Sequence, residues 1–164
     1  MKTKIIIEST LTRELCMAAA KHMVWHNAVF IFFLCIGILL TLTVPIFIAA
    51  GYSAGGAFTA NAGFLPGLAL TAVILCAPWY IGKNMYQKDG GQRIKMTFDD
   101  MQVGIEAGEK RIQLPYGEIK KYAHNEKYLF VFTKGPDAVM YVLPKANFTD
   151  VSFPDFLSFL NEKI

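Results

Sequence analysis

The sequence predicts an α+β membrane protein in which two transmembrane helices form a hairpin and precede a small antiparallel β-sheet domain capped by a C-terminal helix. Two observations carry this prediction. No Asp, Glu, Lys or Arg occurs between Lys21 and Lys83, and charged residues make up only 18% of the chain, against about 25% in an average soluble domain. From Arg93 onward, short segments of alternating apolar and polar residues are separated by turn-forming residues, which is typical of antiparallel strands.

Residues 1–27 are expected on the cytoplasmic side as a short strand followed by an amphipathic helix. Residues 4–8 are rich in isoleucine and favour a strand, but a strand this short is not stable alone. We therefore expect it to pair with the sheet at the other end of the chain. Residues 10–22 combine threonines that can cap a helix with Ala, Leu and Met that favour one, and we expect this helix to run directly into the membrane.

Two apolar segments, residues 28–50 and 64–81, are the predicted transmembrane helices. Each is close to the roughly 20 residues that cross a bilayer core. The first is apolar on all sides, as expected of a helix surrounded by lipid or by other helices. A pair of buried core helices would need a larger soluble domain around it than the remaining chain provides. A cleaved signal peptide also fits poorly, because its apolar core is typically only about 7–15 residues long.

Residues 51–63 form a predicted short exoplasmic loop made mainly of small residues. Gly51 and Gly55, and likewise Gly63 and Gly67, have the spacing that lets helix backbones approach closely in a membrane. Two interpretations stay open at this point: close helix contact, or a short flexible turn.

Basic residues flank the two apolar segments and are missing from the loop between them. Those in the flanks are Lys2, Lys4, Arg13, Lys21, Lys83, Lys88, Arg93 and Lys95. Because cytoplasmic flanks carry an excess of Lys and Arg, we expect a multi-pass protein of the inner (cytoplasmic) membrane with both termini in the cytoplasm. Trp25, Trp79 and Tyr80 lie near the predicted helix ends, where amphipathic rings act as membrane-interface anchors.

Residues 82–164 form the predicted cytoplasmic domain. Strands are expected at residues 95–98, 101–106, 110–114, 118–123, 128–133 and 139–143, with a turn at residues 134–137. Phe156, Leu157 and Leu160 follow Pro154 at helical spacing, so residues 153–160 are expected to form an amphipathic helix. Together these elements predict one small curved sheet capped by a terminal helix.

Three segments of this domain resemble the YcxB-like protein family. They are residues 112–121 (IQLPYGEIKK), the strand at residues 128–132, and residues 141–145 (YVLPK), which precede Phe148 and the Phe-rich helix. In that family a two-helix hairpin precedes a cytoplasmic domain related to pleckstrin-homology (PH) folds, so the resemblance implies a PH-like domain at residues 82–164. Tyr116 stands where the family often has tryptophan. The resemblance implies no activity and no functional residue.

Few residues suggest chemistry. His22 and His26 have a spacing that places two metal ligands on one helix face, but a site needs further ligands, and none is evident nearby. The three cysteines, Cys16, Cys35 and Cys76, lack metal-binding spacing and are interpreted as apolar filler. The sequence contains no nucleophile elbow, phosphate-binding glycine loop or dinucleotide fingerprint. We therefore predict a non-enzymatic protein without a metal or cofactor.

The predicted function is that of a membrane-tethered module that binds a protein or lipid. Lys83, Lys88, Arg93 and Lys95 are candidate lipid headgroup contacts, although topology alone also explains them. The net charge of +3 and pI of about 8.7 do not suggest nucleic acid, whose binding domains have pI values above about 9. Two alternatives stay open: an immunity or inhibitor protein against a toxin acting at the membrane, and a homo-oligomeric pore or transport accessory subunit. The lack of charge within the spans disfavours the second alternative.

Overall fold

A computed structural model describes residues 4–134 and 139–164 of the chain, so most of the turn predicted at residues 134–137 lies outside the described residues. Contacts divide the chain into two compact units. We call the unit made of Met1–Ala19 and Met85–Ile164 the β unit, and the unit made of Ala20–Asn84 the helical unit. The architecture is α+β, with two long apolar helices and antiparallel sheets.

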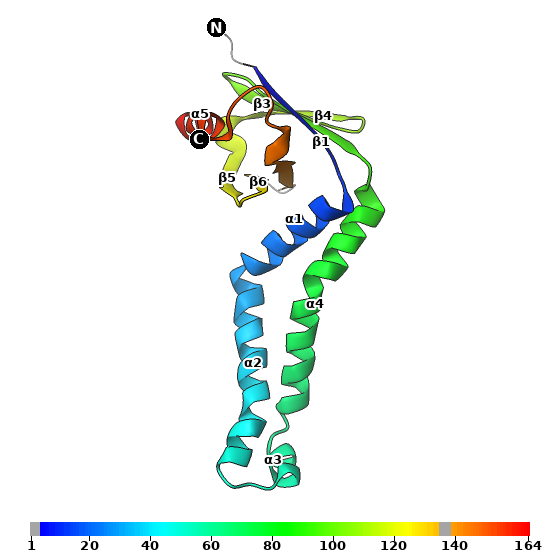
Figure 1. Cartoon of the computed structure of the whole chain (residues 1–164), viewed down its shortest axis with the longest axis vertical. Helices are drawn as coiled ribbons and strands as arrows, with labels where there is room; N and C mark the ends of the chain where they lie inside the picture. Colours follow the sequence, from blue (N-terminus) through cyan, green and yellow to red (C-terminus); the bar gives the residue numbers. More distant parts are fainter. Residues whose placement is uncertain (1–3, 135–138) are drawn as a thin grey trace. The chain divides into compact units, whose positions relative to one another are not determined.

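The first sheet of the β unit joins the N-terminal strand to three strands that follow the two long helices in the sequence (Figure 1). Its order is β1 (Ile5–Thr10), β2 (Arg93–Phe98), β3 (Gln102–Ala107) and β4 (Lys110–Pro115), with every neighbouring pair antiparallel. Ile5 lies opposite Phe98, and Glu8 lies opposite Lys95. The expected pairing of the N-terminal strand with the distant sheet is therefore confirmed.

The second sheet contains β5 (Ile119–His124), β6 (Tyr128–Thr133) and β7 (Met140–Pro144) in that order. The prediction of one continuous sheet is therefore wrong. Pro115 ends β4 and a 3-10 turn, η1 (Tyr116–Glu118), follows it. Because proline has no backbone N–H to donate to a ladder, pairing stops there and the chain turns into a separate sheet.

Tyr116 stabilises the turn at which the chain passes from the first sheet to the second. Its side chain is buried, and its hydroxyl donates a hydrogen bond of 2.7 Å to the backbone carbonyl of Asp99 in the β2–β3 turn. Burial, together with the nearby charges of Asp99 and Asp100, raises the pKa of Tyr116 to about 12. The phenol therefore stays protonated and keeps donating to the Asp99 carbonyl well above neutral pH.

This raised pKa predicts a loss of stability at alkaline pH. In the unfolded chain Tyr116 releases its proton near its ordinary pKa of 10, whereas the folded protein holds the proton up to about pH 12. The Tyr116 contribution is thus fully present below pH 10 and lost as pH rises towards 12. Thermal unfolding of full-length wild type and Tyr116→Phe in detergent should show a shallower alkaline decline for the variant. Identical declines would contradict the assignment.

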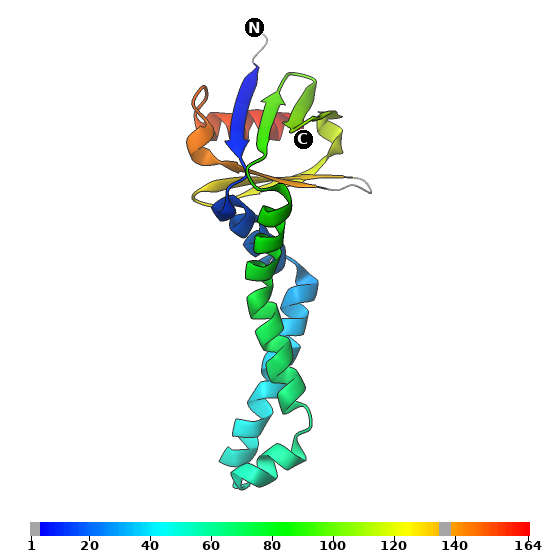
Figure 2. The same cartoon turned by 90° about the vertical axis from the view of Figure 1, so that its right-hand side faces the viewer.

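The core of the β unit lies between its two sheets, and α5 (Phe153–Lys163) closes it. The strands of the two sheets run in crossing directions next to this helix (Figure 2). Ser152 caps the start of α5 by accepting a hydrogen bond from the Asp155 N–H at 3.3 Å. The fully buried Phe156 ring contacts Phe98 and Phe148 edge-on, with centroids 4.8 Å and 4.9 Å away. This aromatic cluster joins the helix to the sheet.

The start of α1 (Arg13–Trp25) covers the other face of the second sheet. Leu15 and Ala19 pack against Phe130 and Val142, whose side chains point away from the main core. A strand in a sheet that is covered on both faces has apolar residues at successive positions, which explains the continuous apolar sequence of β6.

The two helices that were expected to merge are separate. α1 ends at Trp25, and α2 (Ala28–Ala49) begins after Asn27, whose extended backbone and side chain form an N-cap. The Asn27 carboxamide oxygen accepts a hydrogen bond of 2.9 Å from the Val29 N–H. The expectation of an uninterrupted helix from the N-terminal region into the first apolar segment is therefore wrong, because a capping asparagine starts a new helix there.

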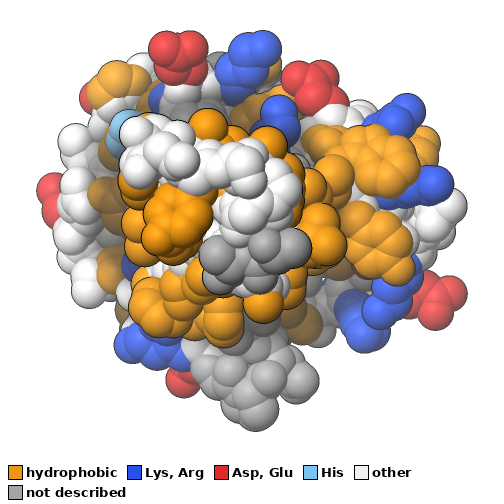
Figure 3. Space-filling model, turned by 90° about the horizontal axis from the view of Figure 1, so that it is seen from below, with side chains coloured by type: hydrophobic (Ala, Val, Ile, Leu, Met, Phe, Trp, Pro, Cys, Tyr) orange, Lys and Arg blue, Asp and Glu red, His pale blue; other side chains and the backbone are white. Residues whose placement is uncertain are grey.

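The helical unit consists of the end of α1, α2, a short α3 (Ala54–Ala60) and most of α4 (Phe64–Asp89). α3 falls within the predicted loop at residues 51–63, and α4 extends beyond the predicted end at residue 81. α2 and α4 are long and apolar enough to cross a membrane, and only 11% and 17% of their most apolar windows are buried. Helices in the core of a soluble protein are mostly buried. Seen from the α3 end, the helical unit presents hydrophobic and uncharged side chains (Figure 3).

α2 and α4 approach each other to backbone contact at Gly37 and Gly67. A Cβ atom added to Gly37 would lie 3.1 Å from the Gly67 carbonyl oxygen, and one added to Gly67 would lie 3.0 Å from the Gly37 carbonyl oxygen. Of the glycines singled out from the sequence, Gly67 is therefore at a helix contact. Gly51 instead has a positive φ of 93°, and Gly55 has no atom near its missing side chain.

A threonine follows each contact glycine by one helical turn. The Thr41 hydroxyl donates to the Gly37 carbonyl at 2.7 Å, and the Thr71 hydroxyl donates to the Gly67 carbonyl at 2.9 Å. These bonds satisfy the hydroxyls within their own helix, which matters where no water is available. The repeated Gly-x-x-x-Thr pattern is a sequence signal for this crossing, and neither copy of it was recognised from the sequence; Gly67 was singled out only for its spacing from Gly63.

Candidate binding groove

An apolar groove of about 540 Å³ lies wholly within the β unit, beside β7. This volume falls within the range of about 300–1,000 Å³ that is typical of ligand sites. The link before α1, α1 itself, the end of α4, β2 and β7 contribute its main apolar lining, which consists of Leu11, Leu15, Met85, Ile94, Met140 and Val142. Segments that are far apart in the sequence therefore meet in one concave surface.

Charged groups stand in the groove lining beside the apolar side chains. Asp89 comes from the end of α4, and Glu109 and Lys110 come from the β3–β4 hairpin. All three residues are exposed, and none of them forms an ion pair with another described residue. The groove thus offers two carboxylates against one ammonium group, which gives it a mild preference for a cationic ligand.

The sequence alone does not predict this groove. Its lining comes from segments that are far apart in the chain, so no local motif marks it. The four-residue spacing of Leu11, Leu15 and Ala19, which runs from just before α1 into the helix, was the available signal that this helix has a buried side. What that side faces depends on the packing of α1 against the second sheet.

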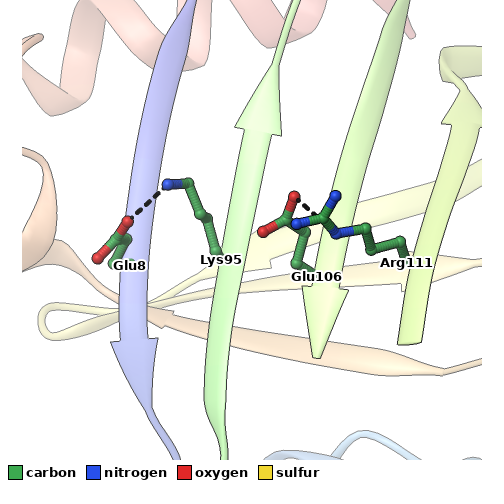
Figure 4. A network of polar contacts seen from close by, with 4 residues as sticks. All are labelled: Glu8, Lys95, Glu106 and Arg111. Carbon is green, nitrogen blue, oxygen red and sulfur yellow. Dashed lines mark ion pairs between the residues drawn. The ribbon is translucent and has the colours of Figure 1, made fainter. Parts of the chain in front are cut away.

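The face of the first sheet that points away from the core towards solvent carries a row of residues with alternating charge (Figure 4). Strand register aligns Glu8, Lys95, Glu106 and Arg111 across the four strands. Lys95 Nζ lies 2.8 Å from Glu8 Oε1, and Arg111 Nε lies 3.4 Å from Glu106 Oε1. The hydrogen bond from Lys95, and then its charge, lower the pKa of Glu8. The row is a set of solvated cross-strand pairs that supports the sheet register.

The candidate headgroup contacts are divided between the two units. Lys83 belongs to the helical unit, where its ammonium lies 5.3 Å from the centre of the Trp79 ring. Lys88 lies in the last turn of α4, and Arg93 and Lys95 lie on β2, all within the β unit. Because Lys95 forms an ion pair with Glu8, its positive charge is partly neutralised by that carboxylate. A role for these residues at lipid headgroups stays a prediction.

The three predicted interface anchors all belong to the helical unit. Trp25 is the last residue of α1, and Trp79 and Tyr80 are consecutive residues of α4. Their exposed fractions are 39%, 52% and 62%, so each ring is available to its surroundings. The contact between Trp79 and Lys83 joins an aromatic ring to a cation, as is common at a membrane surface.

His22 in the last turn of α1 and His26, the residue after its end, stack with ring centroids 4.0 Å apart. His26 Nδ1 lies 3.1 Å from the His22 carbonyl oxygen. Within residues 4–134 and 139–164, no group of three or more His, Cys, Asp and Glu side chains is arranged to hold a metal. Cys16 is buried, and burial raises the pKa of its thiol, so at neutral pH it is protonated.

Comparison with family models, curated proteins and solved structures found no match to this chain. The resemblance to YcxB-like proteins therefore stays a prediction based on the residues given above.

Proposed function

We propose that this protein is a non-enzymatic, membrane-anchored interaction module. The helical unit crosses the cytoplasmic membrane twice, and the β unit binds a partner protein in the cytoplasm through the groove beside β7. We also propose that the β unit is PH-like and that the chain is YcxB-like. Its two sheets and closing C-terminal helix support this assignment.

The membrane anchor is supported by three properties of the helical unit. Large apolar side chains are exposed along both long helices, including Leu39 at 65% and Val73 at 67%. Such surfaces are unfavourable in water and favourable in lipid. No charged residue lies between Lys21 and Lys83, and the two helices cross at glycines, as membrane helices commonly do.

The groove is the observation that carries the binding function. It is concave, mainly apolar and contained in one compact unit. The charged row on the first sheet is less suited to binding, because its members already satisfy one another. α1 and α4, which help to line the groove, also connect the β unit to the helical unit, so a bound partner would be held at the membrane.

Affinity purification from native membranes after mild crosslinking tests this proposal. Two variants carry the same substitution at different places: Met85→Glu puts a charge in the groove, and Met101→Glu puts one in the β2–β3 turn, where Met101 is 81% exposed. We expect one near-stoichiometric protein partner with wild type and Met101→Glu, and at least tenfold lower recovery with Met85→Glu.

Three results would contradict the proposal. Recovery of lipid alone would favour headgroup recognition, and recovery of the protein only with itself would favour a self-assembling membrane unit. Equal partner recovery with both variants would place the binding surface outside the groove.

A further inference from the structure

β7 is an edge strand that borders the groove. The second sheet has the order β5, β6, β7, so within the described residues β7 pairs with β6 on one side and with no strand on the other. The first three residues of β7 and the residue before it, 139–142, line the groove. The free edge of a strand carries unpaired N–H and C=O groups, which are a template for another strand.

Hydrogen bonds at the two ends of β7 establish which residues face β6. The Thr133 N–H donates to the Val139 carbonyl at 3.1 Å, and the Lys145 N–H donates to the Lys127 carbonyl at 2.8 Å. The pairing between these two points is regular, without a bulge. In an antiparallel pair, hydrogen-bonded residues alternate strictly with non-hydrogen-bonded ones.

It follows that Tyr141 and Leu143 turn their main-chain groups towards β6, and that Met140 and Val142 turn theirs away from it. The outward groups of Met140 and Val142 thus lie along the groove that these residues line. The same alternation holds for β1, an edge strand of the first sheet, where the outward carbonyl of Glu8 accepts a hydrogen bond of 2.7 Å from the Asn147 side chain. That edge is covered by η2 (Lys145–Asn147), whereas β7 borders an open groove.

We infer that β7 binds an extended segment of a partner protein, which adds to the second sheet as a fourth strand paired through Met140 and Val142. This inference rests on the proposed function and names its site and its class of partner. Strand addition supplies affinity through main-chain hydrogen bonds, and side-chain pockets supply specificity.

The lining of the groove defines the chemistry of that segment. Side chains of a strand alternate between two faces, so one set would contact the apolar groups of Leu15 and Met85. Asp89 and Glu109 offer carboxylates without an ion-pair partner among the described residues, and they favour a lysine or arginine in the segment. The expected partner segment therefore has apolar residues at alternate positions and at least one basic residue.

Amide hydrogen exchange on the full-length protein in micelles tests the edge directly. In the free protein, the Met140 and Val142 amides should exchange faster than those of Tyr141 and Leu143. The probe is a ten-residue peptide selected from a displayed random library against the full-length protein in lipid nanodiscs. Peptides with alternating apolar residues and a basic residue should be enriched, and their binding should protect the Met140 and Val142 amides.

A matched pair of variants separates the main-chain contribution from the side-chain contribution. Met140→Pro removes an N–H that points away from β6, which an edge strand tolerates, and Met140→Leu keeps that N–H with a similar apolar side chain. Peptide affinity should fall at least tenfold for Met140→Pro and stay within about twofold for Met140→Leu. If Met140→Pro does not fold, combined Asp89→Lys and Glu109→Lys should still weaken the basic peptide at least tenfold.

The inference is overturned if no alternating peptide is enriched, if Met140→Pro binds as well as Met140→Leu, or if the two amides stay unprotected. Binding of phosphatidylglycerol vesicles that competes with the peptide would likewise assign the groove to lipid. If wild type and Met140→Pro capture the same partner from membranes through the groove, the proposed interaction module is supported and strand addition is contradicted. If neither captures a partner, both proposals are contradicted.

Discussion

Replacing Phe156 with alanine should destabilise the β unit by about 3–5 kcal/mol, the usual cost of deleting a buried aromatic ring. Phe156 is fully buried and stands where α5 meets both sheets. Its ring contacts Phe98 and Phe148, so its removal would leave a cavity bounded by other rings that cannot collapse easily. Urea unfolding of the full-length protein in detergent, followed by amide signals of the β unit, measures this change.

Met101→Ala is the control, because Met101 lies in the same unit and is 81% exposed. It should change the free energy of unfolding by less than about 0.5 kcal/mol. A small effect of Phe156→Ala would mean that α5 does not close the core.

Gly67→Ala should destabilise the contact between α2 and α4 by about 1–3 kcal/mol, the usual cost of overpacking a tight site. The added Cβ would lie 2.5 Å from the Leu40 Cβ and 3.0 Å from the Gly37 carbonyl oxygen, and neither atom can move without shifting its helix. Gly37→Ala should also destabilise this contact, because its Cβ would lie 2.5 Å from the Thr71 hydroxyl, which is bonded to the Gly67 carbonyl, and 3.1 Å from that carbonyl oxygen. Trp25 and Trp79 both lie in the helical unit, so tryptophan fluorescence during denaturation in detergent reports on this unit.

Gly55→Ala provides the matched comparison, because no atom in the part of the chain that the structure describes lies within 4 Å of the position its Cβ would occupy. Alanine is favoured over glycine in a helix by about 1 kcal/mol, so this variant should be neutral or slightly stabilised. Equal effects of Gly55→Ala and Gly67→Ala would contradict the helix crossing.

The features that the sequence predicted correctly depend on long, strong patterns. The uncharged stretch between Lys21 and Lys83 predicted two long apolar helices, and alternating residues predicted the antiparallel strands. The isolated strand at the N-terminus predicted pairing across the chain, because it could not be stable by itself. Each of these inferences follows from periodicity or from the need of a strand for a partner.

The errors occurred at single residues that end or redirect an element. Asn27 caps a new helix within an otherwise helical sequence, and Pro115 ends the first sheet where a continuous one was expected. Asparagine and proline are both known to end helices or strands, but the long patterns around these two residues suggested that the helix and the sheet would continue through them. The helix crossing at Gly37 was missed because the glycine lies within a long apolar run. The groove could not be predicted, because its form depends on how distant segments pack.

Cysteine labelling on intact cells tests most directly whether the helical unit anchors the β unit at the cytoplasmic face. Single cysteines would be placed at Phe58 in α3 and at Thr149 in the β unit, both exposed, in a variant whose native cysteines are replaced by alanine. A membrane-impermeant maleimide should label the Phe58→Cys protein on intact cells, and the Thr149→Cys protein only after the membrane is opened. Labelling of both positions from the same side of the membrane would contradict a two-span anchor.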